Sequence, residues 1–111
     1  MSDAIQVPKA ELHCHIEGAA PATLVARLAG KYGVDVSGVL DGNGKYLWSD
    51  FTTFLKAYDL ASSVFRTPAD YALLAEPYFR MLAAEGAIYG EIFISPDHAQ
   101  ATGLSYRSYV E

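Results

Sequence analysis

Two strand-like segments enclose a long stretch of helical pattern, and this order constrains the fold more than any other feature. Residues 8–18 alternate polar and apolar side chains with the period of two that a strand requires. Residues 87–96 are apolar on both faces apart from Glu91, which is typical of a strand covered on both sides. Strands joined by so long a crossover are expected to run parallel. The order therefore predicts an α/β fold with a parallel sheet.

Three helical patterns fill the crossover, at residues 21–32, 50–65 and 67–86. Gly33 suits the C-terminus of the first helix, and Asp50 and Thr67 suit the N-caps of the second and third. Pro77 is expected to kink or split the third helix, because a proline removes a backbone donor there. A dense turn signal at 41–44 predicts a loop over 35–50, and residues 97–111 begin a further helix.

Composition restricts the classes of protein and partner. The chain has 111 residues, of which 51% are hydrophobic and 19% charged, and this balance favours a folded domain over a disordered segment. Its net charge of −5 argues against nucleic acid as a partner. With Cys14 as the only cysteine, and with no secretory leader or membrane span in the pattern, we expect a cytoplasmic protein that binds no membrane. The oligomeric state stays open.

The first strand carries a His-x-His pair at its carboxyl end. In a regular strand Glu11, His13 and His15 share one face, and Glu17 follows them if the strand continues. Two neighbouring neutral imidazoles are suitable ligands for zinc, and the carboxyl ends of barrel strands are where active sites lie. The alternative interpretation is a pair of structural histidines that bond to the backbone.

Four further side chains have expected positions. Glu11 and Glu91 are expected to point into the interior of the parent fold, where they would find hydrogen-bond partners. Cys14 is expected to face the helices as a packing residue, and His98 to lie at the surface of a loop.

Three stretches together resemble a known family. They are Pro-Lys-Ala-Glu-Leu-His-Cys-His-Ile-Glu-Gly-Ala at 8–19, Phe-Thr-Thr-Phe-Leu-Lys-Ala-Tyr-Asp at 51–59 and Glu-Gly-Ala-Ile-Tyr-Gly-Glu-Ile-Phe-Ile-Ser-Pro at 85–96. This set resembles the adenosine deaminase family of amidohydrolases. The resemblance implies a (β/α)8 barrel of the TIM type. Because a whole barrel takes about 250 residues, we expect residues 1–111 to be the N-terminal segment of a single, incomplete barrel domain.

The resemblance also implies roles for individual residues. His13 and His15 would be ligands of one zinc ion, and Glu17 would contact the sugar or the purine of the substrate. The apolar wall over a purine nucleoside would be formed by a stripe on the second helix, namely Phe51, Phe54, Leu55 and Tyr58. On general grounds, such a stripe at helical spacing can equally be core packing.

The reaction implied by the resemblance is hydrolytic deamination, in which a zinc-activated water converts adenosine to inosine and ammonia. The remaining metal ligands and the general acid and base would lie beyond Glu111. The 111-residue chain alone is therefore predicted to be inactive. One cysteine is too few for the zinc site of cytidine-type deaminases, which need a Cys-x-x-Cys pair.

Three alternatives stay open. An adenine deaminase, or a deaminase of modified adenine nucleotides, belongs to the same superfamily, and Glu17 in place of the Asp common in adenosine deaminases leaves the substrate undecided. A metal-dependent phosphoesterase can also begin with His-x-His. A binding or structural domain with two incidental histidines is the third.

Overall fold

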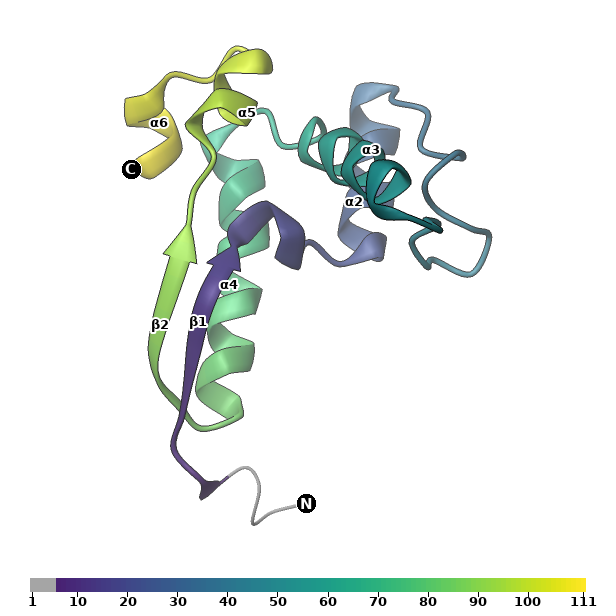
Figure 1. Ribbon diagram of the computed structural model, residues 1–111. Helices are drawn as coiled ribbons and strands as arrows, with labels where there is room; N and C mark the ends of the chain where they lie inside the picture. The colour runs from purple at the N-terminus through teal and green to yellow at the C-terminus, as the bar shows by residue number, and fades with distance from the viewer. Residues whose placement is uncertain (1–5) are drawn as a thin grey trace.

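Two parallel strands form the sheet, as the long crossover predicts. The computed structural model describes residues 6–111, in which β1 (Lys9–His15) pairs in parallel with β2 (Ala87–Phe93) (Figure 1). The helices are η1 (Ile16–Ala19, a 3-10 turn), α2 (Ala22–Tyr32), α3 (Phe51–Ser62), α4 (Pro68–Ala84), α5 (Pro96–Ala101) and α6 (Tyr106–Val110). Within residues 6–111, no helix combines the length and apolar character needed to cross a bilayer.

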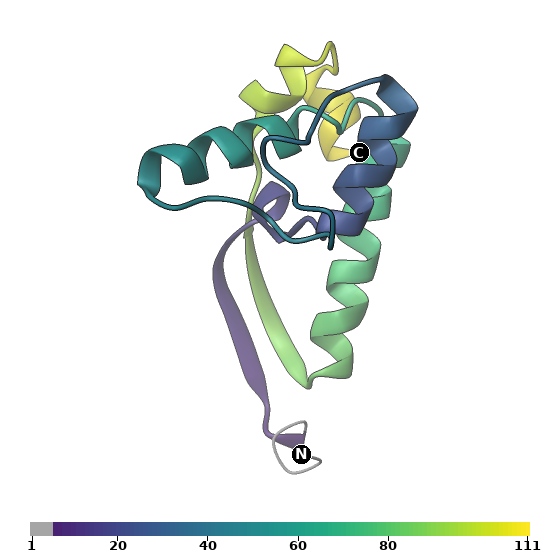
Figure 2. The ribbon, with the colours of Figure 1, turned by 90° about the vertical axis from the view of Figure 1, so that its right-hand side faces the viewer.

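One face of the sheet is covered and the other is open. Helix α4 lies along one face, and Figure 2 shows no element of residues 6–111 against the lower part of the other. Tyr89 and Phe93, which lie on the open face, are exposed. Within residues 6–111 the helix that packs along β2 is α4, and the expectation that β2 is covered on both sides stays a prediction.

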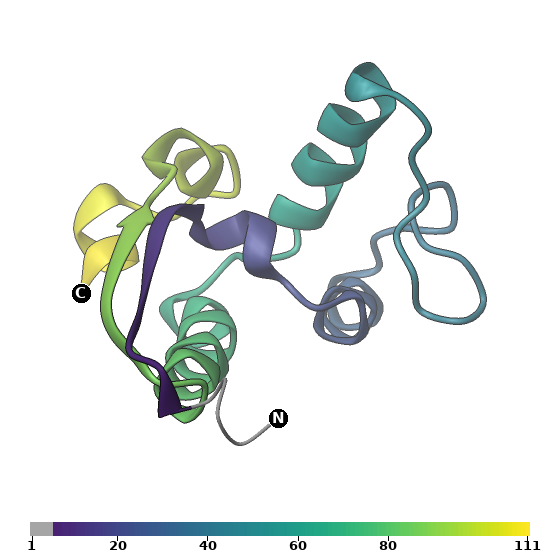
Figure 3. The same cartoon turned by 60° about the horizontal axis from the view of Figure 1, so that its bottom comes forward.

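The remaining helices gather at the carboxyl ends of the strands. Helices α5 and α6 follow β2 directly, while η1 leads from β1 toward α2 and α3, which stand to the side of the sheet (Figure 3). Their shared core contains side chains that solvent hardly reaches, among them Val25, Leu28, Val64, Phe65 and Leu74. This core fixes the helices above the strand ends, where β1 presents its histidines.

The helix ends follow the local signals in the sequence. Asp50 accepts a hydrogen bond from the Thr53 backbone N–H at 2.8 Å, and Thr67 accepts one from the Asp70 N–H at 3.1 Å. Gly33 ends α2 in the left-handed region, with φ of 68°. Pro77 does not split the third helix, because α4 continues through it to Ala84.

Asp70 is the centre of a polar network that the sequence patterns do not reveal. Its side chain is 1% exposed and accepts hydrogen bonds from the Tyr32 hydroxyl and from the backbone N–H groups of Arg66 and Thr67. The Lys31 ammonium lies 3.5 Å from its other oxygen. Burial alone would raise the pKa of Asp70, but the Tyr32 hydrogen bond, the Arg66 N–H and the Lys31 charge together lower it. The ionised carboxylate therefore ties α2 to the start of α4.

Candidate functional site

A bulge in β1 decides which side chains face the site. Glu11 pairs with Gly90 and Cys14 with Ile92, so three steps along β1 match two along β2. His13, inside this bulge, has a positive φ of 59°. Non-glycine residues seldom adopt that conformation, and it is concentrated at functional sites.

The bulge turns the Glu11 side chain toward α4. Gly90 and Ile92 face α4, since a Cβ on Gly90 would lie 3.8 Å from Leu82 and Ile92 packs on the core. Glu11 and Cys14 lie beside Tyr78 of α4. Burial first, and then these two side chains, raise the pKa of the Tyr78 phenol. The prediction that Glu11 shares a face with His13 and His15 is wrong, because strict alternation fails at the bulge; Cys14 does pack toward the helices.

His13 and His15 lie side by side on the uncovered side of the sheet. Their ring centres are 5.2 Å apart, and each ring contacts Phe93, at 4.4 Å and 5.1 Å respectively. Phe93 and Glu91 are two residues apart in β2 and share this face, and the Glu91 carboxylate accepts a hydrogen bond from Tyr89 at 2.8 Å. The two imidazoles thus project from the strand end as a pair, and Glu91 lies on the expected face.

The spacing of the two rings fits a shared metal ion. Two imidazoles bound at about 2.0–2.1 Å to one tetrahedral ion have ring centres about 5 Å apart. Within residues 6–111, no cluster of three or more His, Cys, Asp or Glu side chains is placed to hold a metal. His13 and His15 therefore fit as two ligands of a larger set.

An open cavity of about 990 Å³ extends from this pair to α3, and Glu11, Cys14 and part of α4 also line it. Both histidines line it, together with the apolar stripe of α3, which consists of Phe51, Phe54, Leu55 and Tyr58. Phe51 is 72% exposed, and Phe54 and Leu55 are also exposed. The stripe is therefore not core packing within the described chain. It forms an apolar wall facing the histidines.

Glu17 leaves the strand and becomes buried. It sits in η1 with 2% exposure, and its Oε1 accepts a hydrogen bond from the Tyr109 hydroxyl at 2.5 Å. Among residues 6–111, its Oε2 has no hydrogen-bond partner. Burial and then the Glu17 carboxylate raise the pKa of Tyr58. Glu17, Tyr58 and Phe54 also line a small cavity of about 80 Å³ beside the larger one.

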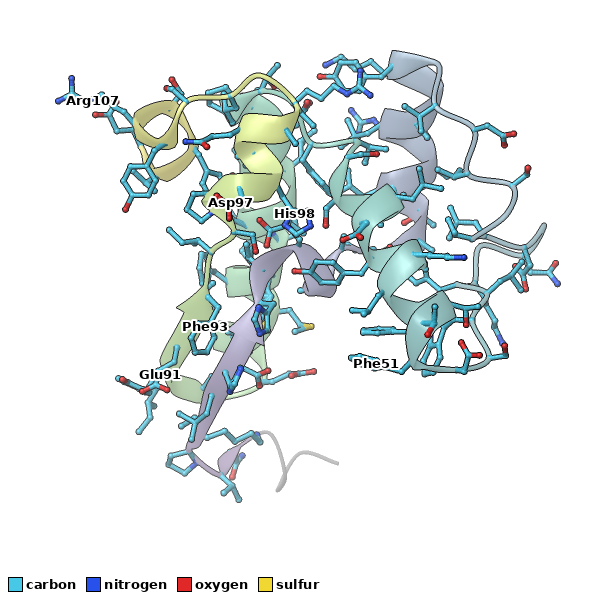
Figure 4. The ribbon with its side chains drawn as sticks, turned by 45° about the horizontal axis from the view of Figure 1, so that its top comes forward. Phe51, Glu91, Phe93, Asp97, His98 and Arg107 are labelled. Atoms are coloured by element: carbon cyan, nitrogen blue, oxygen red, sulfur yellow. The ribbon has the colours of Figure 1, made fainter. Side chains whose placement is uncertain are left out.

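His98 lines the large cavity, which its place in the sequence does not predict. It lies in α5 rather than in a loop, and it is half-buried. Its Nε2 is 3.1 Å from Oδ1 of Asp59 on α3, and its ring contacts Tyr58 (Figure 4). The residues around His98 in the sequence do not predict this contact, because it depends on the packing of α5 against α3.

Comparison with known proteins agrees with this geometry. The model of the adenosine deaminase family matches residues 8–111. The chain belongs to this family. The fold is that of the opening β/α units of the family's TIM-type barrel, so the fold class and the family that the sequence motifs indicate are both confirmed.

Curated relatives within the family are named adenine deaminases. The protein of Chelativorans sp. (strain BNC1) is 62% identical over 103 residues, covering 93% of this chain and 31% of that protein. The protein of Sinorhizobium medicae (strain WSM419) is 56% identical over 103 residues, covering 93% of this chain and 32% of that protein. The chain spans about a third of the length of the curated relatives it matches.

Solved structures give the same picture. The adenine deaminase of Arthrobacter aurescens superposes with a TM-score of 0.74 at 28% identity, over 89% of this chain and 31% of that chain. An N6-mAMP deaminase of Arabidopsis superposes with a TM-score of 0.76 at 26% identity, over 99% of this chain and 34% of that chain.

Proposed function

We propose that this chain supplies the first part of the active site of a metal-dependent purine deaminase whose substrate is adenine. The observation that carries the proposal is the convergence of the His13–His15 pair and the α3 stripe on one cavity. The naming of the relatives favours adenine, the alternative in the sequence interpretation, over adenosine, its first expectation. We further propose that residues 1–111 are the N-terminal segment of a single barrel domain.

Each side chain has a physical task in this proposal. His13 and His15 would hold a zinc ion, which supplies Lewis-acid polarisation and lowers the pKa of water. The α3 stripe would lie against the flat purine and exclude bulk water, since aromatic and aliphatic side chains favour a planar heterocycle. Glu17 would accept a hydrogen bond from the substrate through Oε2, because a buried acceptor without a partner is costly.

A substrate panel tests the activity. Release of the 6-amino group is measured for the full-length protein and for the 111-residue chain alone, as ammonia from adenine and adenosine and as methylamine from N6-methyl-AMP. We expect turnover of adenine by the full-length protein and none by the short chain, which holds two of the metal ligands. Faster turnover of adenosine or of the nucleotide would refute the adenine assignment, and release of neither ammonia nor methylamine from the three substrates would refute deamination.

A separate measurement tests the metal site. His13→Ala and His15→Ala are each expected to abolish stoichiometric zinc in the purified full-length protein. His98→Ala is the matched control, because it removes the third imidazole of the chain, which bonds Asp59 at 3.1 Å instead. Unchanged zinc in the first two variants would favour a binding or structural domain. Ester hydrolysis without ammonia release would favour the phosphoesterase alternative.

A further inference from the structure

We propose that Tyr109 is a positioning residue that holds the Glu17 carboxylate in place and leaves one of its oxygens free for the substrate. This inference rests on the proposed function and extends it to α6, which none of the sequence motifs includes. Tyr109 lies 92 residues from Glu17 along the chain, and its hydroxyl donates to Oε1 at 2.5 Å.

The Tyr109 hydroxyl is itself fixed from two sides. It accepts a hydrogen bond from the Ser95 backbone N–H at 2.8 Å, just beyond β2. The Tyr109 ring packs edge-on against Tyr71 of α4, with ring centres 4.6 Å apart. One phenol therefore connects the turn after β1, the end of β2 and α4. Such a well-held donor restricts the carboxylate it contacts to one orientation.

The protonation of the phenol suits this task. Burial first, and then the hydrogen bond from Tyr109 to the Glu17 carboxylate, raise the pKa of the Tyr109 hydroxyl. The phenol therefore keeps its proton and remains a donor. Glu17 then has one oxygen engaged by Tyr109, while the other lacks a partner within residues 6–111.

Because Glu17 Oε2 has no partner in the described residues, we infer that it accepts a hydrogen bond from an N–H group of the ligand. A buried carboxylate oxygen without a donor is costly, and a ring N–H of a free purine base would satisfy it. A carboxylate free to rotate would lose that alignment. Tyr109 thus contributes to substrate binding without touching the substrate.

Removing single hydroxyl groups tests the inference. Tyr109→Phe keeps the ring and its packing but deletes the donor to Glu17. Tyr71→Phe is the matched control, because Tyr71 packs against the Tyr109 ring and its buried hydroxyl has no hydrogen-bond partner in the described part of the chain. In the full-length protein, we expect Tyr109→Phe to raise the KM for adenine about tenfold, as loss of a charge-assisted hydrogen bond does. We expect kcat to change less than about threefold.

A double variant distinguishes positioning from a general structural role. If Tyr109 acts through Glu17, adding Tyr109→Phe to Glu17→Gln should raise KM little further. Independent, multiplying effects would overturn the proposal, as would a Tyr109→Phe variant that keeps its KM or matches Tyr71→Phe.

Crystal structures of the two single variants give a readout that needs no turnover. The Glu17 carboxylate should be displaced in Tyr109→Phe and unmoved in Tyr71→Phe. An unmoved Glu17 in both would overturn the proposal. If the wild-type protein releases no ammonia from any purine, the proposed function fails, and the position of Glu17 in these crystals still decides the role of Tyr109.

Discussion

Because the backbone at His13 is left-handed and that at His15 is not, we expect glycine and alanine substitutions to rank in opposite orders of stability at the two residues. His13 has φ of 59°, whereas His15 has φ of −76° and ψ of 117°, an ordinary extended conformation. In the left-handed region a Cβ costs about 1–2 kcal/mol, and glycine avoids this cost but loses about 0.5–1 kcal/mol in chain entropy. From the midpoints of these two ranges, His13→Gly should therefore be more stable than His13→Ala by about 0.75 kcal/mol.

The order should reverse at His15, where glycine brings the entropy loss and relieves no clash. His15→Gly is expected to be less stable than His15→Ala by about 0.5–1 kcal/mol. All four variants lack the imidazole at the substituted position, so each Gly–Ala comparison isolates the backbone. Urea unfolding in the presence of a chelator, which removes any contribution from bound metal, measures the four free energies. Equal stability of His13→Ala and His13→Gly would contradict the left-handed conformation of His13 and the position of the bulge.

Three further changes test the network, the cavity wall and a helix end. Asp70→Asn should lower the free energy of unfolding at pH 7 by about 2 kcal/mol. Because the folded pKa of Asp70 is lowered from its ordinary value of 3.8, the ionised carboxylate stabilises the fold fully above pH 3.8. Urea unfolding at a series of pH values should show the difference from wild type shrink as pH falls through the folded pKa. Phe54→Ala should raise the KM for adenine severalfold in the ammonia assay, whereas Phe79→Ala, on α4 outside the large cavity, should leave it unchanged. Gly33→Ala should cost about 1 kcal/mol in urea unfolding because φ is 68°, whereas Gly30→Ala, inside α2 with open space around it, should stabilise by about 0.5–1 kcal/mol.

Features set by neighbouring residues were predictable from the sequence. The caps at Asp50 and Thr67 and the end at Gly33 depend on contacts within a few residues, and the structure has all three. The parallel pairing of β1 and β2 follows from the length of the crossover. The family motifs brought the α3 stripe and the histidine pair together, and both line one cavity.

Features set by distant residues were not predictable. Tyr109 meets Glu17 across most of the chain, and His98 meets Asp59 only because α5 packs against α3. The alternation of polar and apolar residues over 8–18 is compatible with a regular strand and with a bulged one. It therefore could not predict that Glu11 turns toward α4. Hydrophobic periodicity specifies which faces are apolar, and it leaves a local change of register undetermined.

The bulge also bears on the choice of metal. In a regular strand the Glu11 carboxylate would accompany both imidazoles, and a mixed set of oxygen and nitrogen donors suits several divalent ions. Glu11 lines the same cavity but lies beside Tyr78, and within residues 6–111 it forms no metal-holding cluster with the two histidines, so β1 offers the ion two imidazole nitrogens. Imidazole donors suit zinc and similar transition metals, whereas magnesium and calcium prefer oxygen. We therefore expect zinc to exclude magnesium in a competition measured by metal analysis; retention of magnesium at equal concentrations would contradict this argument.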